Sequence, residues 1–296
     1  MKFFAVLIRC GTPIAVAGLL LILVGWLTTV PRLGLAGFVL ILLGTIPQLL
    51  PVRLGERAPV ALRSPVQGRW VAVNSPADKV PSHGTHELGQ SYAIDLVHAP
   101  DPAREWKALV GWPLAARPAT FPAFGRPVLA PADGTVVAVG RHQRDHWSRN
   151  SWPALIYLMV EGMVFRSIGS LLTLSPARFV LGNHVILDLG DGVYGVFAHL
   201  RRGSVRVRPG DRVRAGDQLG EVGNSGNSSE PHLHFHLMDG PHPMWAQGVP
   251  FTIEYRTDDG EARTGVPAGK HPFVVPDPAA NAADPSYGVG AQPGIG

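Results

Sequence analysis

The sequence has little or none of several features on which common protein classes depend. Its single cysteine, Cys10, excludes an internal disulfide. A net charge of +4 spread over 296 residues is too diffuse to indicate a nucleic-acid partner. No G-x-S-x-G serine elbow is present, and neither is a Walker A loop or a dinucleotide fingerprint. These absences argue against a serine hydrolase and against a nucleotide-binding enzyme.

Residues 1–54, by contrast, are rich in apolar sequence. One uncharged apolar run extends from about Thr12 to Val30, and a second extends from Leu33 to about Val52. Each run approaches the roughly 20 residues that are needed to cross a bilayer. Pro31 and Arg32 between them form a minimal turn. We therefore expect residues 1–54 to be a transmembrane helical hairpin that contacts lipid and anchors the chain at the cell membrane.

The charges that flank these runs bear on the orientation of the remaining chain. Positive residues outside the two runs outnumber the one in the turn, Arg32; they are Lys2, Arg9, Arg53 and Arg57. By the positive-inside rule this bias places the rest of the chain in the cytoplasm. If only the first run crosses, the rest of the chain lies outside. We expect the extracytoplasmic placement, because the chemistry described below fits no obvious cytoplasmic role.

Beyond a Pro-rich linker within residues 55–82, the pattern is one of short strands separated by turns. The expected strands are Gly68–Val73, Tyr92–Leu96, Pro127–Pro131, Gly134–Gly140, Asn183–Leu189, Val193–His199, Ser204–Arg208, Gln218–Val222 and His232–Met238. The Asp-Gly turn within residues 190–192 favours a hairpin. Helical periodicity is not convincing in the segments between these strands, so we expect an all-β, antiparallel core.

Two segments depart from this pattern. Residues 141–181 read as an insertion, and the apolar stretch from Ala154 to Leu174 inside it predicts an amphipathic helix. That helix would lie either on a membrane or on the sheet. Residues 257–296 are rich in proline, glycine and alanine, a composition that cannot bury enough apolar surface to offset chain entropy. We expect this tail to be disordered.

The strand at 232–238 carries the clearest chemical signal. Its histidines alternate with apolar residues, so His232 and His234 share one face while Phe235 points into the core. Two imidazoles on one face are a start on a metal site, since a catalytic Zn²⁺ takes about three protein ligands and keeps one position open. Asp95 lies in another apolar strand, where a carboxylate is costly unless it is paired with a cation.

The segment Pro231-His-Leu-His-Phe235 resembles the HxH motif of the M23 metallopeptidases, the lysostaphin and LytM-like endopeptidases that cut peptidoglycan cross-links. Further segments agree in the same order; they are Gly125–Val137, Gly182-Asn183, Phe197–Leu200 and Val207–Gly220. Several linked motifs are more specific than a lone HxH. The resemblance implies a hairpin-rich, LytM-like β-sandwich of the duplicated hybrid motif type over residues 83–256.

The resemblance also implies a site and a reaction. Zn²⁺ would be bound by His86, Asp95 and His234, and the catalytic histidines would be His199 and His232. The family's first His and Asp are commonly closer together than His86 and Asp95, so His83 stays a rival ligand. The expected substrates are peptidoglycan peptides, hydrolysed by a metal-activated water. Glu230, just before the motif, is expected at most to shape the substrate groove, and no protein partner is indicated.

Two other functions stay open. Some LytM-like proteins have lost ligands and activate other wall hydrolases, and such a scaffold would hold no zinc. Residues 210–220 also resemble the hairpins of carrier domains. A phospho-histidine carrier would account for the paired histidines but not for Asp95. Because all five site positions are filled, we expect the zinc endopeptidase.

Overall fold

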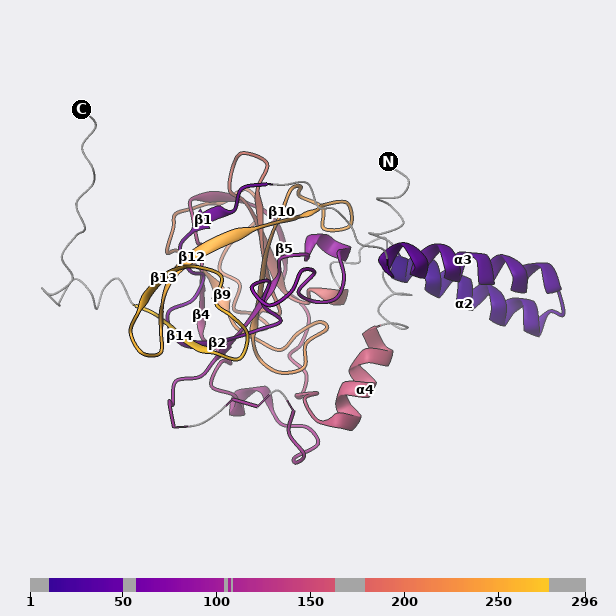
Figure 1. The fold of residues 1–296 in the computed structure, drawn as a ribbon, viewed down its shortest axis with the longest axis horizontal. Coiled ribbons are helices and arrows are strands. Elements are labelled where there is room, and N and C mark those ends of the chain that lie inside the picture. Colours follow the sequence, from indigo (N-terminus) through magenta and orange to yellow (C-terminus); the bar gives the residue numbers. More distant parts are fainter. Residues whose placement is uncertain (1–10, 50–56, 104–105, 108, 163–178, 277–296) are drawn as a thin grey trace, which may run out of the picture.

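The computed structural model describes residues 11–49, 57–103, 106–107, 109–162 and 179–276. A β-sheet domain forms the larger part, and a pair of helices extends away from it (Figure 1). The chain therefore separates into the two kinds of structure that its apolar runs and its alternating strands predict.

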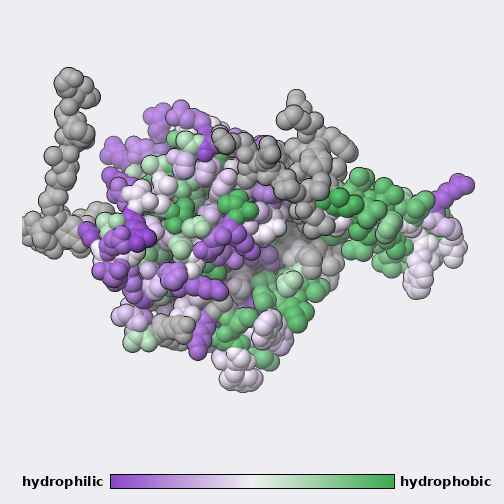
Figure 2. All heavy atoms as spheres, viewed as in Figure 1, coloured by the Kyte–Doolittle hydropathy of each residue, from purple (hydrophilic) through white to green (hydrophobic). Residues whose placement is uncertain are grey.

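The helix pair forms where the two apolar runs lie. It consists of α2 (Gly11–Leu27) and α3 (Pro31–Leu49). Glycine permits their close approach, because a Cβ added to Gly18 would lie 2.5 Å from the backbone oxygen of Gly37. Hydrophobic residues cover the body of the pair on the visible face, and more hydrophilic residues lie at its free end (Figure 2). The predicted helical hairpin is thus present as two packed helices.

The prediction that this hairpin anchors the chain in the cell membrane is wrong. Among the residues that the structure describes, no helix is both long enough and apolar enough to cross a membrane. The predicted localisation at the cell membrane is therefore not supported.

The β domain is built on a twelve-stranded sheet with the path β1-β12-β14-β2-β3-β10-β7-β6-β5-β8; β11 pairs with β10, and β13 pairs with β12. Its strands are β1 (Val60–Leu62), β2 (Gly68–Val73), β3 (Ile94–His98), β5 (Gly134–Gly140), β6 (His184–Asp188), β7 (Tyr194–Ala198), β8 (Arg212–Val213), β10 (Leu233–Met238), β11 (Gly248–Val249), β12 (Phe251–Thr257), β13 (Ala262–Gly265) and β14 (Pro272–Val275). A second sheet pairs β4 (Pro127–Leu129) with β9 (Gln218–Glu221). Apart from the parallel pair of β1 and β12, the strand pairings are antiparallel. The all-β, antiparallel prediction is therefore confirmed in part: the domain is mostly β-sheet, and the insertion adds a helix.

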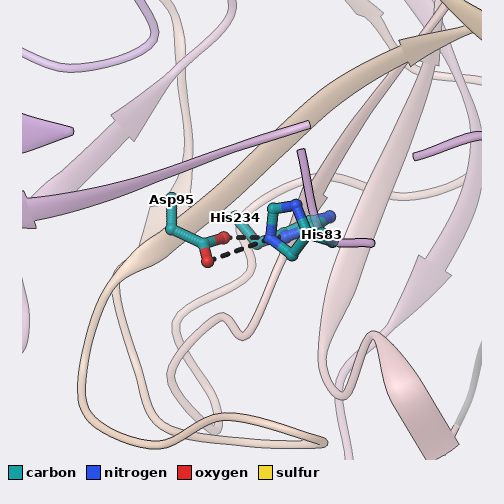
Figure 3. A group of neighbouring side chains, drawn as sticks. All are labelled: His83, Asp95 and His234. Atoms are coloured by element: carbon teal, nitrogen blue, oxygen red, sulfur yellow. Dashed lines mark hydrogen bonds and ion pairs between the residues drawn. The ribbon is translucent and has the colours of Figure 1, made fainter. Parts of the chain in front are cut away.

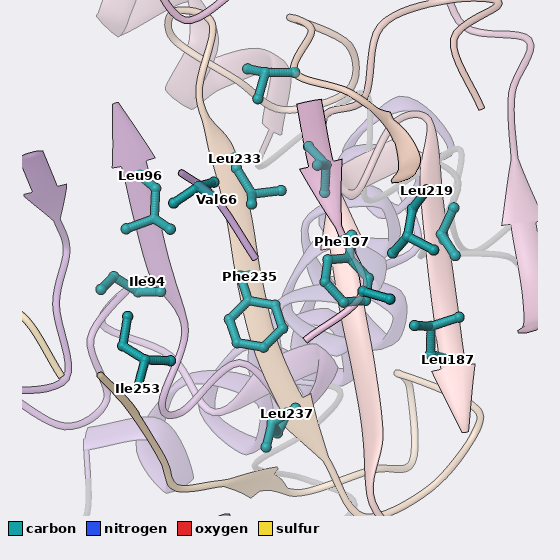
Figure 4. Packing of buried hydrophobic residues seen from close by; sticks show 14 of the residues in the cluster. Val66, Ile94, Leu96, Leu187, Phe197, Leu219, Leu233, Phe235, Leu237 and Ile253 are labelled. Carbon is teal, nitrogen blue, oxygen red and sulfur yellow. The ribbon is translucent and has the colours of Figure 1, made fainter. Parts of the chain in front are cut away.

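The main core lies on one face of the central strands. Alternation along β10 sends Leu233, Phe235 and Leu237 into it, and all three side chains are fully buried. Phe197 of β7 packs against Phe235 with ring centroids 5.2 Å apart. Figure 4 shows these side chains filling the space beside the sheet together with Leu219 of the small sheet. The same alternation sends the histidines of β10 to the opposite face.

The expected disorder from residue 257 onward is wrong for residues up to 276. Strand β14 pairs with β2 on one side and with β12 on the other, and β13 forms a hairpin with β12. Phe273 is buried and packs on Tyr255 with ring centroids 5.6 Å apart. Two neighbouring strands supply the burial that the composition alone does not. Residues 277–296 lie outside the described part of the chain.

Two further expectations are corrected in part. Ser204–Arg208 is not a strand. In the insertion, α4 (Trp152–Val160) begins close to the predicted position, and the rest of the predicted helix falls largely on residues 163–178, outside the described residues. Leu158 is the buried residue of α4, while Ile156 and Met159 are exposed. Short 3-10 turns at Glu87–Gly89 and Pro118–Thr120 complete the described elements.

Candidate functional site

Two neighbouring strands fix the first half of the site. Strands β3 and β10 pair antiparallel with His234 directly opposite Asp95. Side chains opposite one another in such a pair have Cβ atoms about 5 Å apart. Nδ1 of His234 accordingly lies 2.9 Å from Oδ1 of Asp95. Both side chains are buried on the face opposite the main core, so the sheet register alone brings these two predicted ligands together.

A loop supplies the third side chain. His83, which precedes the 3-10 turn at Glu87–Gly89, places its Nε2 atom 3.0 Å from Oδ2 of Asp95. The ligand atoms of His83, Asp95 and His234 all lie within 4.8 Å of one another. Figure 3 shows both imidazoles directed at the one carboxylate. Two imidazole nitrogens and a carboxylate oxygen form a donor set that suits Zn²⁺.

The structure does not bring His86 into this group, and this corrects the choice made between the two histidines. Nδ1 of His86 instead pairs with Oγ of Ser91 at 2.8 Å. Directly after His86 the chain enters the 3-10 turn, where Leu88 has a left-handed backbone with φ of 58°. The loop has no repeating geometry, so spacing along the sequence does not say which of its histidines faces Asp95.

Each of the three grouped residues also forms a hydrogen bond with a residue outside the group. His83 Nδ1 pairs with Ser82 Oγ at 3.0 Å, His234 Nε2 pairs with His236 Nδ1 at 3.1 Å, and Asn74 Nδ2 donates to Asp95 Oδ2 at 2.9 Å. Partners of this kind orient metal ligands and select the tautomer of a ligating histidine. Sequence reasoning missed Asn74, which follows β2 in a turn. His236 continues the period of two on the histidine face and is completely buried there.

His199 and His232, the predicted catalytic pair, lie beside this group. Their ring centroids are 4.8 Å apart, and Nε2 of His232 is 3.4 Å from Asp95 Oδ1. Nδ1 of His199 meets the carbonyl oxygen of Ser225 at 2.8 Å, and Nδ1 of His232 meets that of Glu230 at 2.7 Å. A carbonyl only accepts, so each Nδ1 must be the donor. In the neutral state each Nε2 therefore carries a lone pair, and Nε2 of His232 donates to Asp95 only when that imidazole is protonated.

The backbone around His199 is shaped to hold this arrangement. His199 follows the last residue of β7 and has φ of 61°, a left-handed conformation that a non-glycine residue rarely adopts. The turn that contains Ser225 is fixed by its hydroxyl, which donates to the Leu200 carbonyl at 2.8 Å. At Gly182, a Cβ would lie 2.5 Å from the Ser225 backbone, so glycine is required there. These contacts give the Gly182-Asn183 motif and the turn at Ser225 a structural role.

The electrostatics of the group favour a bound cation. Burial alone would raise the pKa of Asp95, but the neighbouring His83 and His232 and the hydrogen bonds to His232 and His234 hold that pKa well below its usual range. Burial lowers the pKa of His199 well below its ordinary value. Burial acts in the same direction on His232, yet the adjacent Asp95 raises the pKa of His232 overall. The centre thus holds a buried carboxylate anion among imidazoles.

Comparison with known proteins bears on the same residues. Residues 161–245 match the model of peptidase family M23. This part of the chain is similar to peptidase family M23. The match includes His199, His232 and His234, whereas His83 and Asp95 precede it. The resemblance drawn from the HxH strand is thereby confirmed for the M23 region.

Curated relatives match over short stretches of the chain. The cell division protein DipM of Caulobacter vibrioides is 40% identical over 60 residues, which cover 20% of this chain and 10% of that protein. The glycyl-glycine endopeptidase ALE-1 of Staphylococcus capitis is 45% identical over 58 residues, which cover 19% of this chain and 16% of that protein. The matched part is thus less than one fifth of either relative.

Solved M23 structures align over a larger share of the chain. The catalytic domain of lysostaphin from Staphylococcus simulans is 22% identical, with 56% of this chain and 76% of that chain covered and a TM-score of 0.30. A zinc-containing peptidase from Vibrio cholerae is 18% identical, with 66% of this chain and 39% of that chain covered and a TM-score of 0.29.

Proposed function

We propose that this protein is a zinc-dependent endopeptidase that hydrolyses peptide cross-links of bacterial peptidoglycan, with His83, Asp95 and His234 as the metal ligands. One observation carries the proposal. Ligand atoms from a loop and two strands, within an M23 protein, converge within 4.8 Å of one another. The proposal keeps two of the three ligands expected from the sequence and replaces His86 by His83.

The residues beside the metal ligands suit hydrolysis of an amide. When bound, zinc supplies a Lewis acid that lowers the pKa of a water ligand to about 7. His199 and His232 each direct a donor Nδ1 at a backbone carbonyl, which leaves Nε2 to accept a proton from the attacking water or to return one to the leaving amine. A protonated Nε2 can also donate a hydrogen bond to the developing oxyanion. The two histidines therefore fill the general acid and base roles together.

The substrate class is supported by the relatives rather than by the pocket. One matched relative is named a glycyl-glycine endopeptidase and another a cell division protein. Both names are compatible with work on cell-wall peptides. The chain covers only 16% and 10% of these proteins, so their activities reach this chain as part of the proposal.

The test uses the full chain, purified and loaded with zinc. We expect about one zinc per chain by elemental analysis, release of new amino groups from purified peptidoglycan, loss of that release with a chelator, and its return when zinc is restored. A chain that binds no zinc and releases no amines would contradict the proposal and favour the non-catalytic activator. Zinc binding without release of amines from any peptidoglycan tested would contradict the proposed substrate class.

A further inference from the structure

A second hollow adjoins the histidine cluster at the ends of the same two strands. It has a volume of about 550 Å³, within the range of small-molecule sites. Its lining includes Val97 and His98, which follow Asp95 along β3, and Glu230 and Pro231, which precede His232. Because β3 and β10 are neighbours in the sheet, the hollow adjoins the histidine cluster along the same two strands.

Glu230 lies in the lining of the hollow, and burial raises the pKa of its carboxyl to about 7. It is only 5% exposed, and it accepts hydrogen bonds from Trp106 Nε1 at 3.0 Å and from Asn150 Nδ2 at 3.2 Å. These two bonds occupy one site on each carboxylate oxygen and leave further acceptor capacity on both. No ion pair with a lysine or arginine is found for Glu230 among the described residues. A buried carboxylate in this state favours a cationic partner.

Other polar atoms in the lining are also unsatisfied. Asn150 is 3% exposed, and its Oδ1 atom has no hydrogen-bond partner. The same holds for Nδ1 of His98, which is 6% exposed. Buried acceptors without partners are uncommon in folded proteins, where each costs about 1–3 kcal/mol. The Glu230 oxygens and Asn150 Oδ1 together offer three acceptor sites to an incoming group.

The walls of the hollow are partly apolar, and they also include the charged residues Asp101 and Lys107. Val97, Val110 and Phe121 lie along it, and the ring of Trp106 adds to them. Such a surface contacts a methylene stem, while the acceptors at its end contact a donor head. An alkylammonium group has both parts, since its nitrogen carries three donors and no acceptor. A neutral aliphatic side chain would fill the space and leave the acceptors unpaired.

We propose that this hollow is a specificity pocket for a substrate residue whose aliphatic side chain ends in a primary ammonium group, with Glu230 and Asn150 as its receptors. The proposal rests on the proposed peptidase function and names the side chain that the enzyme selects beside the scissile bond. It gives Glu230 a direct role in recognition, beyond shaping the groove. Substrates built only of glycine would leave the pocket unfilled.

Binding tests the pocket without reference to hydrolysis. At pH 8, we expect the full chain to bind Nα-acetyl-lysine amide at least about tenfold more tightly than the norleucine analogue, which lacks the ammonium group. Glu230→Gln should remove this preference and Glu254→Gln, an exposed control, should keep it. Equal binding of the two probes by the wild type, or an unchanged preference in Glu230→Gln, would overturn the proposal.

Cleavage then tests the pocket as part of the enzyme. Two peptides that differ only in lysine or norleucine beside the scissile bond should differ by about tenfold in kcat/KM, mostly through KM, and Glu230→Gln should equalise them. Should Glu230→Gln not fold, Trp106→Phe removes the indole donor to Glu230 and should reduce the preference several-fold. If the protein binds the lysine probe selectively but cleaves neither peptide, the result contradicts the proposed peptidase function and supports the proposed pocket.

Discussion

The strand-borne and loop-borne parts of the site differ in how they are held. Asp95 and His234 face one another because the register of β3 and β10 leaves no other choice. His83 reaches the same point from a loop in which His86, three residues later, points elsewhere. A strand defines the direction of each side chain by its period of two, whereas a loop defines it residue by residue. The proposed metal centre therefore combines two ligands that the sheet register holds in place with a third ligand whose position depends on the conformation of a loop.

The largest expected effect comes from replacing the two loop histidines, His83 and His86, one at a time by alanine. We expect His83→Ala to lower zinc affinity by more than the roughly 100-fold typical of losing an outer partner, because it removes a direct ligand. His86→Ala should keep about one zinc per chain, since His86 contacts Ser91 instead. Competition with a zinc-sensitive dye measures both. Loss of zinc in His86→Ala with retention in His83→Ala would show that the loop rearranges when metal binds.

The second prediction separates metal binding from proton transfer. His199→Ala should retain zinc and lose about 10²–10⁴-fold in turnover, because Nε2 of His199 is proposed to move a proton rather than to bind metal. His142→Ala, an exposed histidine of the insertion, serves as the matched control and should be unchanged. Zinc content and peptidoglycan hydrolysis are measured on the same samples. Loss of zinc in His199→Ala would move that residue into the ligand set.

The smallest effect concerns the hydrogen bond behind Asp95. Asn74 has φ of 49°, so Asn74→Gly removes the amide without straining the backbone. We expect zinc affinity to fall by about 10-fold, at the low end for an outer partner of a metal ligand. Asn74→Ala should weaken zinc binding as much and also lower the free energy of unfolding by about 1 kcal/mol. Unchanged affinity in both variants would show that the His83 and His234 contacts orient Asp95 without help.

The sequence predicts the strand part of the site well because burial and alternation coincide there. The pattern around 232–238 indicates both the core residues and the histidine face, and an acidic residue in an apolar strand marks Asp95 as paired. The loop part is less legible, because a 3-10 turn with a left-handed Leu88 decides between His83 and His86. Asn74 and the hollow beside Glu230 depend on segments far apart in the chain, and no local pattern announces them.

A similar limit applies at the two ends of the β domain. The apolar runs predict helices correctly, but none of the helices that the structure describes is both long enough and apolar enough for the predicted crossing. In the tail, proline and glycine suggest a chain without structure, yet Phe273 finds a place between β2 and β12. Composition describes a whole segment, whereas the four-residue strand β14 forms because β2 and β12 pair with its two edges.

The position of β14 has a practical consequence for dissecting this protein. A fragment cut after β12, where the sequence motifs end, would strip two strands of their shared neighbour and leave their amide and carbonyl groups open along bare edges. Such edges recruit other chains and promote aggregation. Because β2 also pairs with β3, which carries Asp95, the exposed strand edge would lie one strand away from a proposed zinc ligand. Shortened versions should therefore retain the chain through residue 276.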